Sequence, residues 1–201
     1  GTLLQHFKEL MIHTDLKRKD KIFYFTTCGW MMWNWLVSSL AVGSTVVLYD
    51  GNPFFPKSDS LLEIADSINV SIFGTSAKYI SALEQDNLKP NDNFSFTKLR
   101  TILSTGSPLV EENFEYVYDN WKDDIQLCSI SGGTDIISCF ALGNPIKPIK
   151  KGKLQSIGLG MSVKSFNHKG EHEIGKKGEL VCTLPFPSMP IYFLNDPKKE
   201  K

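Results

Sequence analysis

Short apolar runs and longer amphipathic stretches alternate over the first 140 or so residues, and no other feature constrains the fold of this chain as much. The short runs are rich in β-branched and aromatic residues, as strands are; they occupy residues 21–26, 45–49, 70–73, 99–104 and 125–130. Helical patterns stand between them, for example over 30–42 and 77–85. Strands that alternate with helices build a parallel sheet covered by helices, so the sequence predicts an α/β fold.

Three segments carry more detailed predictions. The start of the chain predicts a helix whose buried face holds Leu3, Leu4, Phe7, Leu10 and Met11. Segment 30–42 is apolar on nearly every side, which indicates a helix that is buried all round. The β-branched run over 45–49 is typical of a central strand.

The pattern changes after the first 143 residues. Prolines and the Lys-rich segment 147–153 lead into short strands near 161–166 and 179–183. We interpret the charge run as a solvated loop, although such a loop can also contact the phosphates of a large cosubstrate. The sequence therefore predicts an α/β part over 1–143 and a smaller, β-rich and incomplete part over 144–201.

Charge and cysteine content exclude several classes of partner and site. The 22 basic and 22 acidic side chains balance, so the composition gives no reason to expect a nucleic-acid or anionic-membrane partner. The four cysteines lack C-x-x-C spacing and no histidine stands at zinc-ligand spacing, so we expect reduced thiols in a cytosolic protein without structural zinc. Segment 30–42 is too short to span a bilayer, and none of the four histidines is placed to assist a nucleophile.

Three unusual loops follow predicted strands. They read T-T-C-G-W-M-M-W-N-W over 26–35, S-T-G-S-P over 104–108 and S-I-S-G-G-T-D over 129–135. In open parallel sheets, ligands bind beyond the carboxyl ends of the strands. A binding site of this chain is therefore expected where these loops meet.

The third loop has the side chains that a phosphate and a metal ion require. Gly132 and Gly133 let the backbone approach a ligand closely. The Thr134 hydroxyl suits a phosphate oxygen, and the Asp135 carboxylate suits magnesium. The alternative is a plain Gly-rich turn with an Asx-type cap. Taken alone, such a loop is more often the plain turn.

The other two loops also allow a functional and a structural interpretation. Backbone groups over 105–108 can wrap an adenine, or Ser107 and Pro108 can cap the next helix. Segment 30–35, with three Trp and two Met, can line an apolar pocket for a small organic group or simply belong to the core. For each loop on its own, the structural interpretation is the more common one.

The three loops occur in a fixed order and are followed by G-E-L-V-C-T over 178–183. This ordered set resembles the adenylate-forming acyl-CoA synthetase family over essentially the whole chain. The longer strings I-L-S-T-G-S-P-L and S-I-S-G-G-T-D-I-I-S-C-F carry the resemblance further. It implies an enzyme that activates a carboxylate with ATP to give an acyl-adenylate and pyrophosphate, after which coenzyme A displaces AMP to give a thioester. It also implies small-molecule substrates, a cytosolic location and a role in lipid metabolism.

The resemblance further implies roles for individual residues. Thr134 contacts the α-phosphate, and Asp135, which is Glu in many relatives, is a magnesium ligand. The nucleotide is bound by Gly106, Ser107, Pro108, Ser129, Ile130, Ser131, Gly133 and Thr134. The acyl group is surrounded by Trp30, Met31, Thr105 and Gly132.

Gly132 carries the expectation about substrate size. Acetate-activating members of the family have a bulky aromatic residue at the matching position. A glycine there removes volume from the wall, which implies room for a longer acid such as acetoacetate. We expect Gly132→Trp to shift the preference of the full-length enzyme toward acetate.

Several parts of the family pattern are not in these 201 residues. The resemblance places a phosphate loop with its lysine upstream, and a ribose-binding aspartate, a hinge and a lysine-bearing lid downstream. It therefore implies an internal piece of an adenylation domain that is inactive by itself. Three alternatives stay open: a non-catalytic binding or regulatory domain with this fold, another short-chain acyl-CoA synthetase, and an unrelated α/β nucleotide-binding module.

Overall fold

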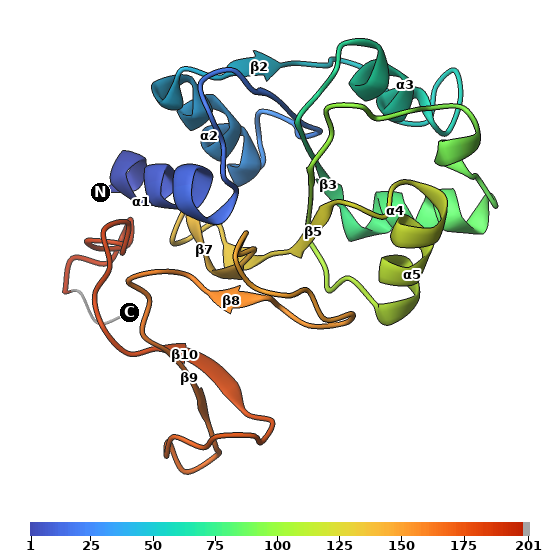
Figure 1. The fold of residues 1–201 in the computed structure, drawn as a ribbon. Helices are drawn as coiled ribbons and strands as arrows, with labels where there is room; N and C mark the ends of the chain where they lie inside the picture. Colours follow the sequence, from blue (N-terminus) through green and yellow to red (C-terminus); the bar gives the residue numbers. More distant parts are fainter. Residues whose placement is uncertain (199–201) are drawn as a thin grey trace.

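The structure, a computed structural model, describes residues 1–198 (Figure 1). Its centre is a parallel sheet of five strands in the order β2-β1-β3-β4-β5. The strands are β1 (Lys21–Tyr24), β2 (Thr45–Val47), β3 (Ile72–Ser76), β4 (Thr101–Thr105) and β5 (Gln126–Ser129). This arrangement confirms the predicted α/β class.

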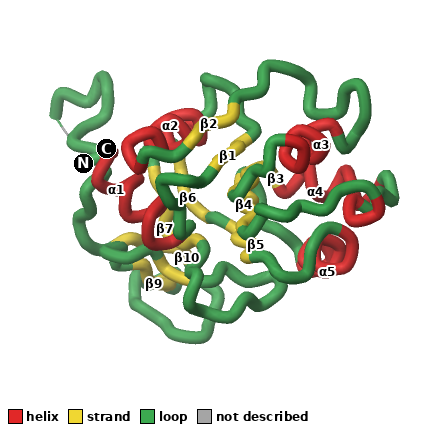
Figure 2. Tube along the Cα trace, turned by 45° about the horizontal axis from the view of Figure 1, so that its top comes forward, coloured by secondary structure: helices red, strands yellow, loops and turns green. Residues whose placement is uncertain are grey.

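Helices cover both faces of this sheet (Figure 2). One side carries α1 (Thr2–Lys8), α2 (Met31–Ser38) and the 3-10 helix η2 (Ser39–Val42). Helix α1 continues as the π-helix η1 (Glu9–His13) on the same side. The other side carries α3 (Ser60–Ser67), α4 (Ala77–Gln85), the 3-10 helix η3 (Pro90–Asp92) and α5 (Glu111–Asn120). None of the helices among residues 1–198 is long and apolar enough to cross a membrane.

The strand register builds the two halves of the core. Four apolar residues lie side by side across β1, β3, β4 and β5: Phe23, Phe73, Ile102 and Leu127. They belong to the apolar cluster under α3, α4 and α5. Neighbouring strand residues such as Ile22 point the other way and pack under η1 and α2. A sheet that is buried on both faces needs apolar residues at successive positions, which explains why its strands read as continuous apolar runs.

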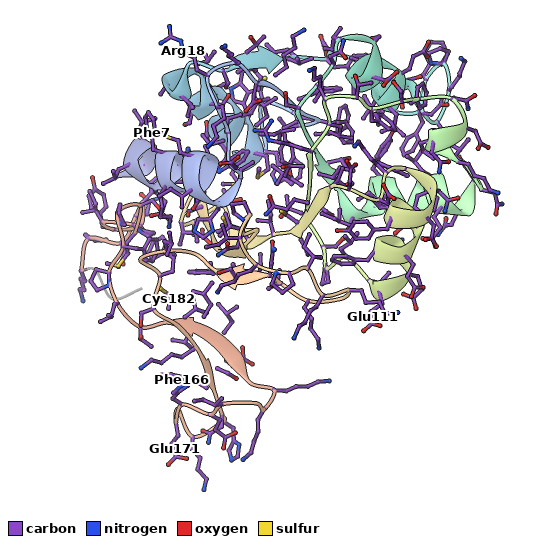
Figure 3. The ribbon with its side chains drawn as sticks, viewed as in Figure 1. Phe7, Arg18, Glu111, Phe166, Glu171 and Cys182 are labelled. Carbon is purple, nitrogen blue, oxygen red and sulfur yellow. The ribbon has the colours of Figure 1, made fainter. Side chains whose placement is uncertain are left out.

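The rest of the chain forms antiparallel structure. Strands β6 (Ser131–Gly133), β7 (Ser138–Leu142) and β8 (Ser156–Ile157) make a three-stranded sheet. Strands β9 (Val163–Phe166) and β10 (Glu179–Cys182) pair as a ribbon that projects from the body, with Phe166 and Glu171 far from the helices (Figure 3). The proposed division at residue 143 stays a prediction, and residues 199–201 lie outside the described part of the chain.

The N-terminal helix buries the face opposite to the predicted one. Leu3, Leu4 and Met11 are exposed by 49%, 66% and 46%, and only Leu10 of the expected apolar set is fully buried. The buried positions are polar instead: Gln5, His6, Glu9 and His13. These side chains hydrogen-bond to the segment around β7, and burial of a polar group is tolerated when it has such a partner.

Three other sequence predictions were wrong in detail. The helix expected over 30–42 is buried on one side only, and its Val37 and Leu40 are exposed, because α2 meets the sheet with a single face. Strand β2 pairs with β1 alone among the described residues, so it is an edge strand and not a central one. Ser107 and Pro108 do not cap a helix, since α5 begins at Glu111.

A partly buried ion pair joins Arg100, the residue before β4, to Asp20, the residue before β1. Arg100 donates from Nη1 to Oδ1 of Asp20 at 2.7 Å and from Nη2 to Oδ2 at 2.5 Å, and also binds the carbonyl of Asp15. Burial disfavours the ionised form of the Asp20 side chain. The hydrogen bonds from Arg100 and from the Lys17 backbone N–H, together with the positive charge of Arg100, favour the ionised form and outweigh the effect of burial. The pKa of Asp20 is therefore lower than usual. The resulting stability is fully present above the ordinary Asp pKa of about 3.9 and is lost as pH falls through the lower, folded value.

We expect Asp20→Asn to destabilise the protein at pH 7 by about 1 to 2 kcal/mol, because the variant loses the charge-assisted bonds while Arg100 stays partly solvated. Denaturant unfolding at several pH values measures the effect, which should shrink below about pH 4. Glu63→Gln is the control, since its ion pair with Lys57 is long and exposed. Equal losses for both variants at pH 7 would contradict the prediction.

Candidate active site

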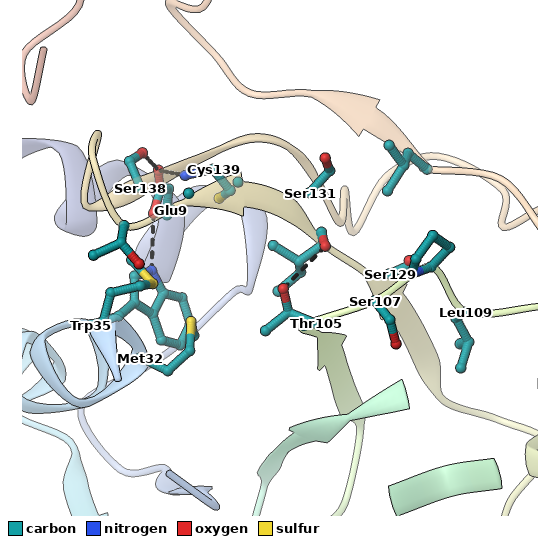
Figure 4. A pocket seen from close by; sticks show the side chains of 18 of the residues that line it. Glu9, Met32, Trp35, Thr105, Ser107, Leu109, Ser129, Ser131, Ser138 and Cys139 are labelled. Atoms are coloured by element: carbon teal, nitrogen blue, oxygen red, sulfur yellow. Dashed lines mark hydrogen bonds between the residues drawn. The ribbon is translucent and has the colours of Figure 1, made fainter. Parts of the chain in front are cut away.

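A pocket of about 390 Å³ opens beyond the carboxyl ends of β1, β4 and β5 (Figure 4). All three loops singled out in the sequence contribute to it. It is lined by every residue predicted to bind nucleotide or acyl group: Trp30, Met31, Thr105, Gly106, Ser107, Pro108, Ser129, Ile130, Ser131, Gly132, Gly133 and Thr134. Asp135 is not among the described lining residues and lies in the same turn as Thr134. The volume is in the range of small-molecule sites.

The first loop enters the pocket through Trp30, the residue before α2. The Tyr24 ring supports it: its edge contacts with Trp30 and Trp35 have ring centroids 6.1 Å and 6.2 Å apart. Tyr24 can lie flat on β3 because Gly74 has no side chain; a Cβ there would stand 2.0 Å from the ring. The Trp-rich loop is therefore both core and pocket wall.

The second loop turns sharply at Gly106, whose φ of +89° lies in the left-handed region that favours glycine. This turn brings Gly106 opposite the Trp30 ring, since a Cβ at Gly106 would be 3.7 Å from that indole. The Thr105 hydroxyl donates to the Ile130 carbonyl at 3.1 Å and ties the second loop to the third. Ser107 and Pro108 are left exposed along the pocket.

The third loop is strand β6 followed by the turn 134–137. Gly132 pairs with Cys139 across a β-bulge, and a Cβ at Gly132 would lie 2.2 Å from the Ser138 carbonyl oxygen. The glycine is therefore required for β6 to approach β7. A side chain at this position would point at the backbone of β7, which changes the expectation for Gly132→Trp. By contrast, a Cβ at Gly133 would have no atom within 4 Å.

Two hydrogen bonds hold the turn that carries Thr134 and Asp135. The Ile137 N–H donates to the Thr134 carbonyl at 3.0 Å. Ile137 itself has a φ of +46°, an uncommon conformation for a β-branched residue. Its carbonyl accepts a hydrogen bond of 2.6 Å from Nε2 of the buried His6. The buried polar face of the N-terminal helix thus supports the turn.

Part of the pocket lining was not predicted from the sequence. The further residues are Glu9, Met32, Trp35, Leu109, Ser138, Cys139 and Gly152–Leu154. A signal for Glu9 exists in the sequence, because Gln5, His6, Glu9 and His13 recur on one helical face. Lys153 comes from the loop that was interpreted as solvated.

The titratable groups near the pocket do not form a nucleophile. The pKa of the Cys139 thiol lies well above its usual value. Burial is the largest cause, and the neighbouring Glu9 charge and the hydrogen bond with Glu9 add to it. Burial likewise raises the pKa of Tyr24 far above its usual range. Both groups therefore stay protonated at neutral pH, and the arrangement suits binding and charge stabilisation.

Among residues 1–198, no group of three His, Cys, Asp or Glu side chains is placed to hold a metal ion. The exposed Asp135 still fits magnesium, since this ion commonly takes one or two protein carboxylates and completes its shell with phosphate and water oxygens.

Comparison with known proteins gives a consistent result. No protein-family model matches the chain. An acetoacetyl-coenzyme A synthetase from Rhizobium meliloti (strain 1021) is 54% identical over all 201 residues. The acetoacetyl-CoA synthetase structure from Streptomyces lividans matches 99% of the chain with a TM-score of 0.93 and 42% identity. The chain spans 31% of the length of each of these two proteins.

A more distant structure shares the fold. The anthranilate CoA ligase AuaEII, in complex with anthranoyl-AMP, matches 89% of the chain with a TM-score of 0.78 and 16% identity, and the match covers 34% of that ligase.

Proposed function

Because this chain belongs to the acetoacetyl-CoA synthetase family, we propose that the whole protein ligates acetoacetate to coenzyme A with ATP, through an acetoacetyl-adenylate. One observation carries the proposal: three loops from separate strands meet in a single pocket, in the order of the family pattern. The family membership and the geometry thus support the same function.

The reaction requires a carboxylate to attack the α-phosphorus of ATP, which brings two anions together. Thr134 supplies a hydroxyl donor at the pocket surface, and the open backbone at Gly133 lets a phosphate approach closely. Fixed donors of this kind stabilise charge that develops in the transition state. Phosphoryl-type chemistry depends on such positioning, so the absence of a nucleophile among the described lining residues fits the proposal.

The remaining lining divides between the two substrates. We assign the adenine to Gly106–Pro108 and Ser129–Ser131, and the acyl group to the section between Trp30 and Gly132. Asp135 would hold magnesium, which supplies positive charge for the phosphate oxygens when bound. Lys153, which also lines the pocket, adds a positive charge from the chain itself.

We extend the proposal to a cytosolic enzyme of lipid metabolism. The described cysteines Cys28, Cys128, Cys139 and Cys182 are all free thiols, which supports a reducing compartment.

Acetoacetate-dependent exchange of pyrophosphate into ATP tests the function in the full-length protein. We expect exchange that requires acetoacetate and magnesium, and acetoacetyl-CoA when coenzyme A is added. Exchange with acetate or butyrate but not with acetoacetate would favour another short-chain synthetase. No exchange with any acid would favour the non-catalytic alternative.

A further inference from the structure

The hairpin turn between β6 and β7 carries both residues that the proposed function assigns to phosphate and magnesium. It runs over residues 134–137, and the Ile137 N–H closes it on the Thr134 carbonyl at 3.0 Å. Thr134 and Asp135 are exposed on this turn. The direction of the Thr134 hydroxyl therefore depends on the backbone conformation of the turn.

The last residue of this turn has an uncommon conformation. Ile137 has a φ of +46°, which is unfavourable for a β-branched side chain. Such a residue keeps its conformation only where the surrounding structure holds it. Helix α1 supplies this support: Nε2 of His6 donates to the Ile137 carbonyl at 2.6 Å, and Nε2 of Gln5 donates to the Ser138 hydroxyl at 2.8 Å. The helix therefore stabilises the shape of the turn.

His6 uses both nitrogens of its ring. The residue is fully buried. A carbonyl can only accept, so Nε2 carries the proton of the bond to Ile137. Nδ1 lies 2.8 Å from the hydroxyl of Ser38, the last residue of α2, and α2 begins directly after the pocket residue Trp30. The imidazole thus connects the helix of the first loop to the turn of the third.

We infer that His6 is a positioning residue, which holds Thr134 where its hydroxyl meets the α-phosphate of ATP. This inference rests on the proposed function. In that reaction an acetoacetate oxygen bonds to the α-phosphorus while the bond to pyrophosphate breaks, and Thr134 donates to a phosphate oxygen that gains charge. A donor stabilises such charge only from the correct place, and a small displacement is costly. His6 is not among the described lining residues of the pocket, so it acts through Ile137.

Two substitutions of His6 separate its two contacts. The amide of asparagine ends at the distance of Nδ1 from the backbone, so it can reach Ser38 but not the Ile137 carbonyl. Glutamine is one bond longer and can place an N–H where Nε2 lies. In acetoacetate-dependent pyrophosphate exchange by the full-length protein, we expect His6→Asn to lower kcat about tenfold and to change KM less than about twofold. His6→Gln should keep kcat within about threefold of the wild type.

The Thr134→Val background shows whether His6 acts through Thr134. The donor is already absent there, so His6→Asn should lower kcat less than about twofold in that background. A general loosening of the fold lowers kcat by the same factor in both backgrounds, and that result overturns the inference.

His13 is the matched control for the loss of a buried histidine. It is buried on the same face and binds the Gly143 carbonyl and the Leu159 N–H, neither of which belongs to the described pocket lining. His13→Asn should lower the melting temperature and leave kcat of the folded enzyme unchanged. A fall in its kcat equal to that of His6→Asn overturns the inference.

The remaining outcomes are also decisive. Should His6→Asn not fold, His6→Gln decides: kcat within about threefold of the wild type supports the inference, and a loss of about tenfold or more in the folded variant overturns it. Equal effects of His6→Asn in both backgrounds, with normal exchange in the wild type, leave the proposed function intact. Absence of exchange with any acid in the wild type overturns the proposed function and this inference together.

Discussion

Replacing Thr134 by valine is expected to lower acetoacetate-dependent pyrophosphate exchange by the full-length protein about 100- to 1,000-fold. Thr134 is the exposed hydroxyl of the turn that borders the pocket. Valine keeps its shape and removes its donor, so a phosphate oxygen that gains charge in the transition state loses a fixed partner. The loss should appear mainly in kcat, since the bond strengthens as charge develops.

Two measurements make this result interpretable. Thr134→Ser keeps a hydroxyl and should retain most of the exchange rate. The melting temperature of Thr134→Val should equal that of the wild type, because the side chain is exposed and makes no described hydrogen bond within residues 1–198. A valine variant with a third or more of the wild-type rate would remove Thr134 from the mechanism.

Gly132→Ala should have the largest effect on stability, at about 3 kcal/mol or more. The new Cβ would meet the Ser138 carbonyl oxygen at 2.2 Å and the Cys139 Cα at 2.6 Å. Both are backbone atoms of β7, which cannot yield as a flexible side chain can. Strand β6 would have to move from β7, and the turn with Thr134 would move with it.

The neighbouring glycine is a matched control. Gly133→Ala lies in the same strand, and its Cβ would have no atom within 4 Å. Thermal unfolding should therefore show a large drop for Gly132→Ala and almost none for Gly133→Ala. Equal melting temperatures would contradict the close approach of β6 and β7. The same contact predicts that Gly132→Trp loses folded protein before it changes the preferred acid.

Much of the sheet could be predicted from local pattern. Helix α4 was predicted with its observed bounds, and all five parallel strands fall within or next to predicted runs. Segments buried on both faces give a strong apolar signal that needs no knowledge of their neighbours. The three loops were found because Gly, Thr and Trp are unusual together at strand ends.

Features that depend on distant partners could not be predicted in this way. Gln5 and His6 on α1 are buried because Ser138 and Ile137, more than 130 positions later, accept their hydrogen bonds. The role of Gly132 depends on the bulge in β6, which local pattern does not reveal. Strand 45–49 is at an edge because of strand order, and its own composition cannot report that.

A polar inner face also determines how α1 and η1 can dock. An apolar helix face can shift its packing register at little cost, because one methyl group can take the place of another. Each buried polar side chain on this face has a hydrogen-bond partner of its own; they are Gln5, His6, Glu9 and His13. A shift of the helix by one turn would leave the Glu9 carboxyl group buried without its hydrogen bonds, at a cost of about 3 to 5 kcal/mol. Only one alignment of this helix is therefore stable, and the wall it adds to the cavity has the same shape in every folded molecule.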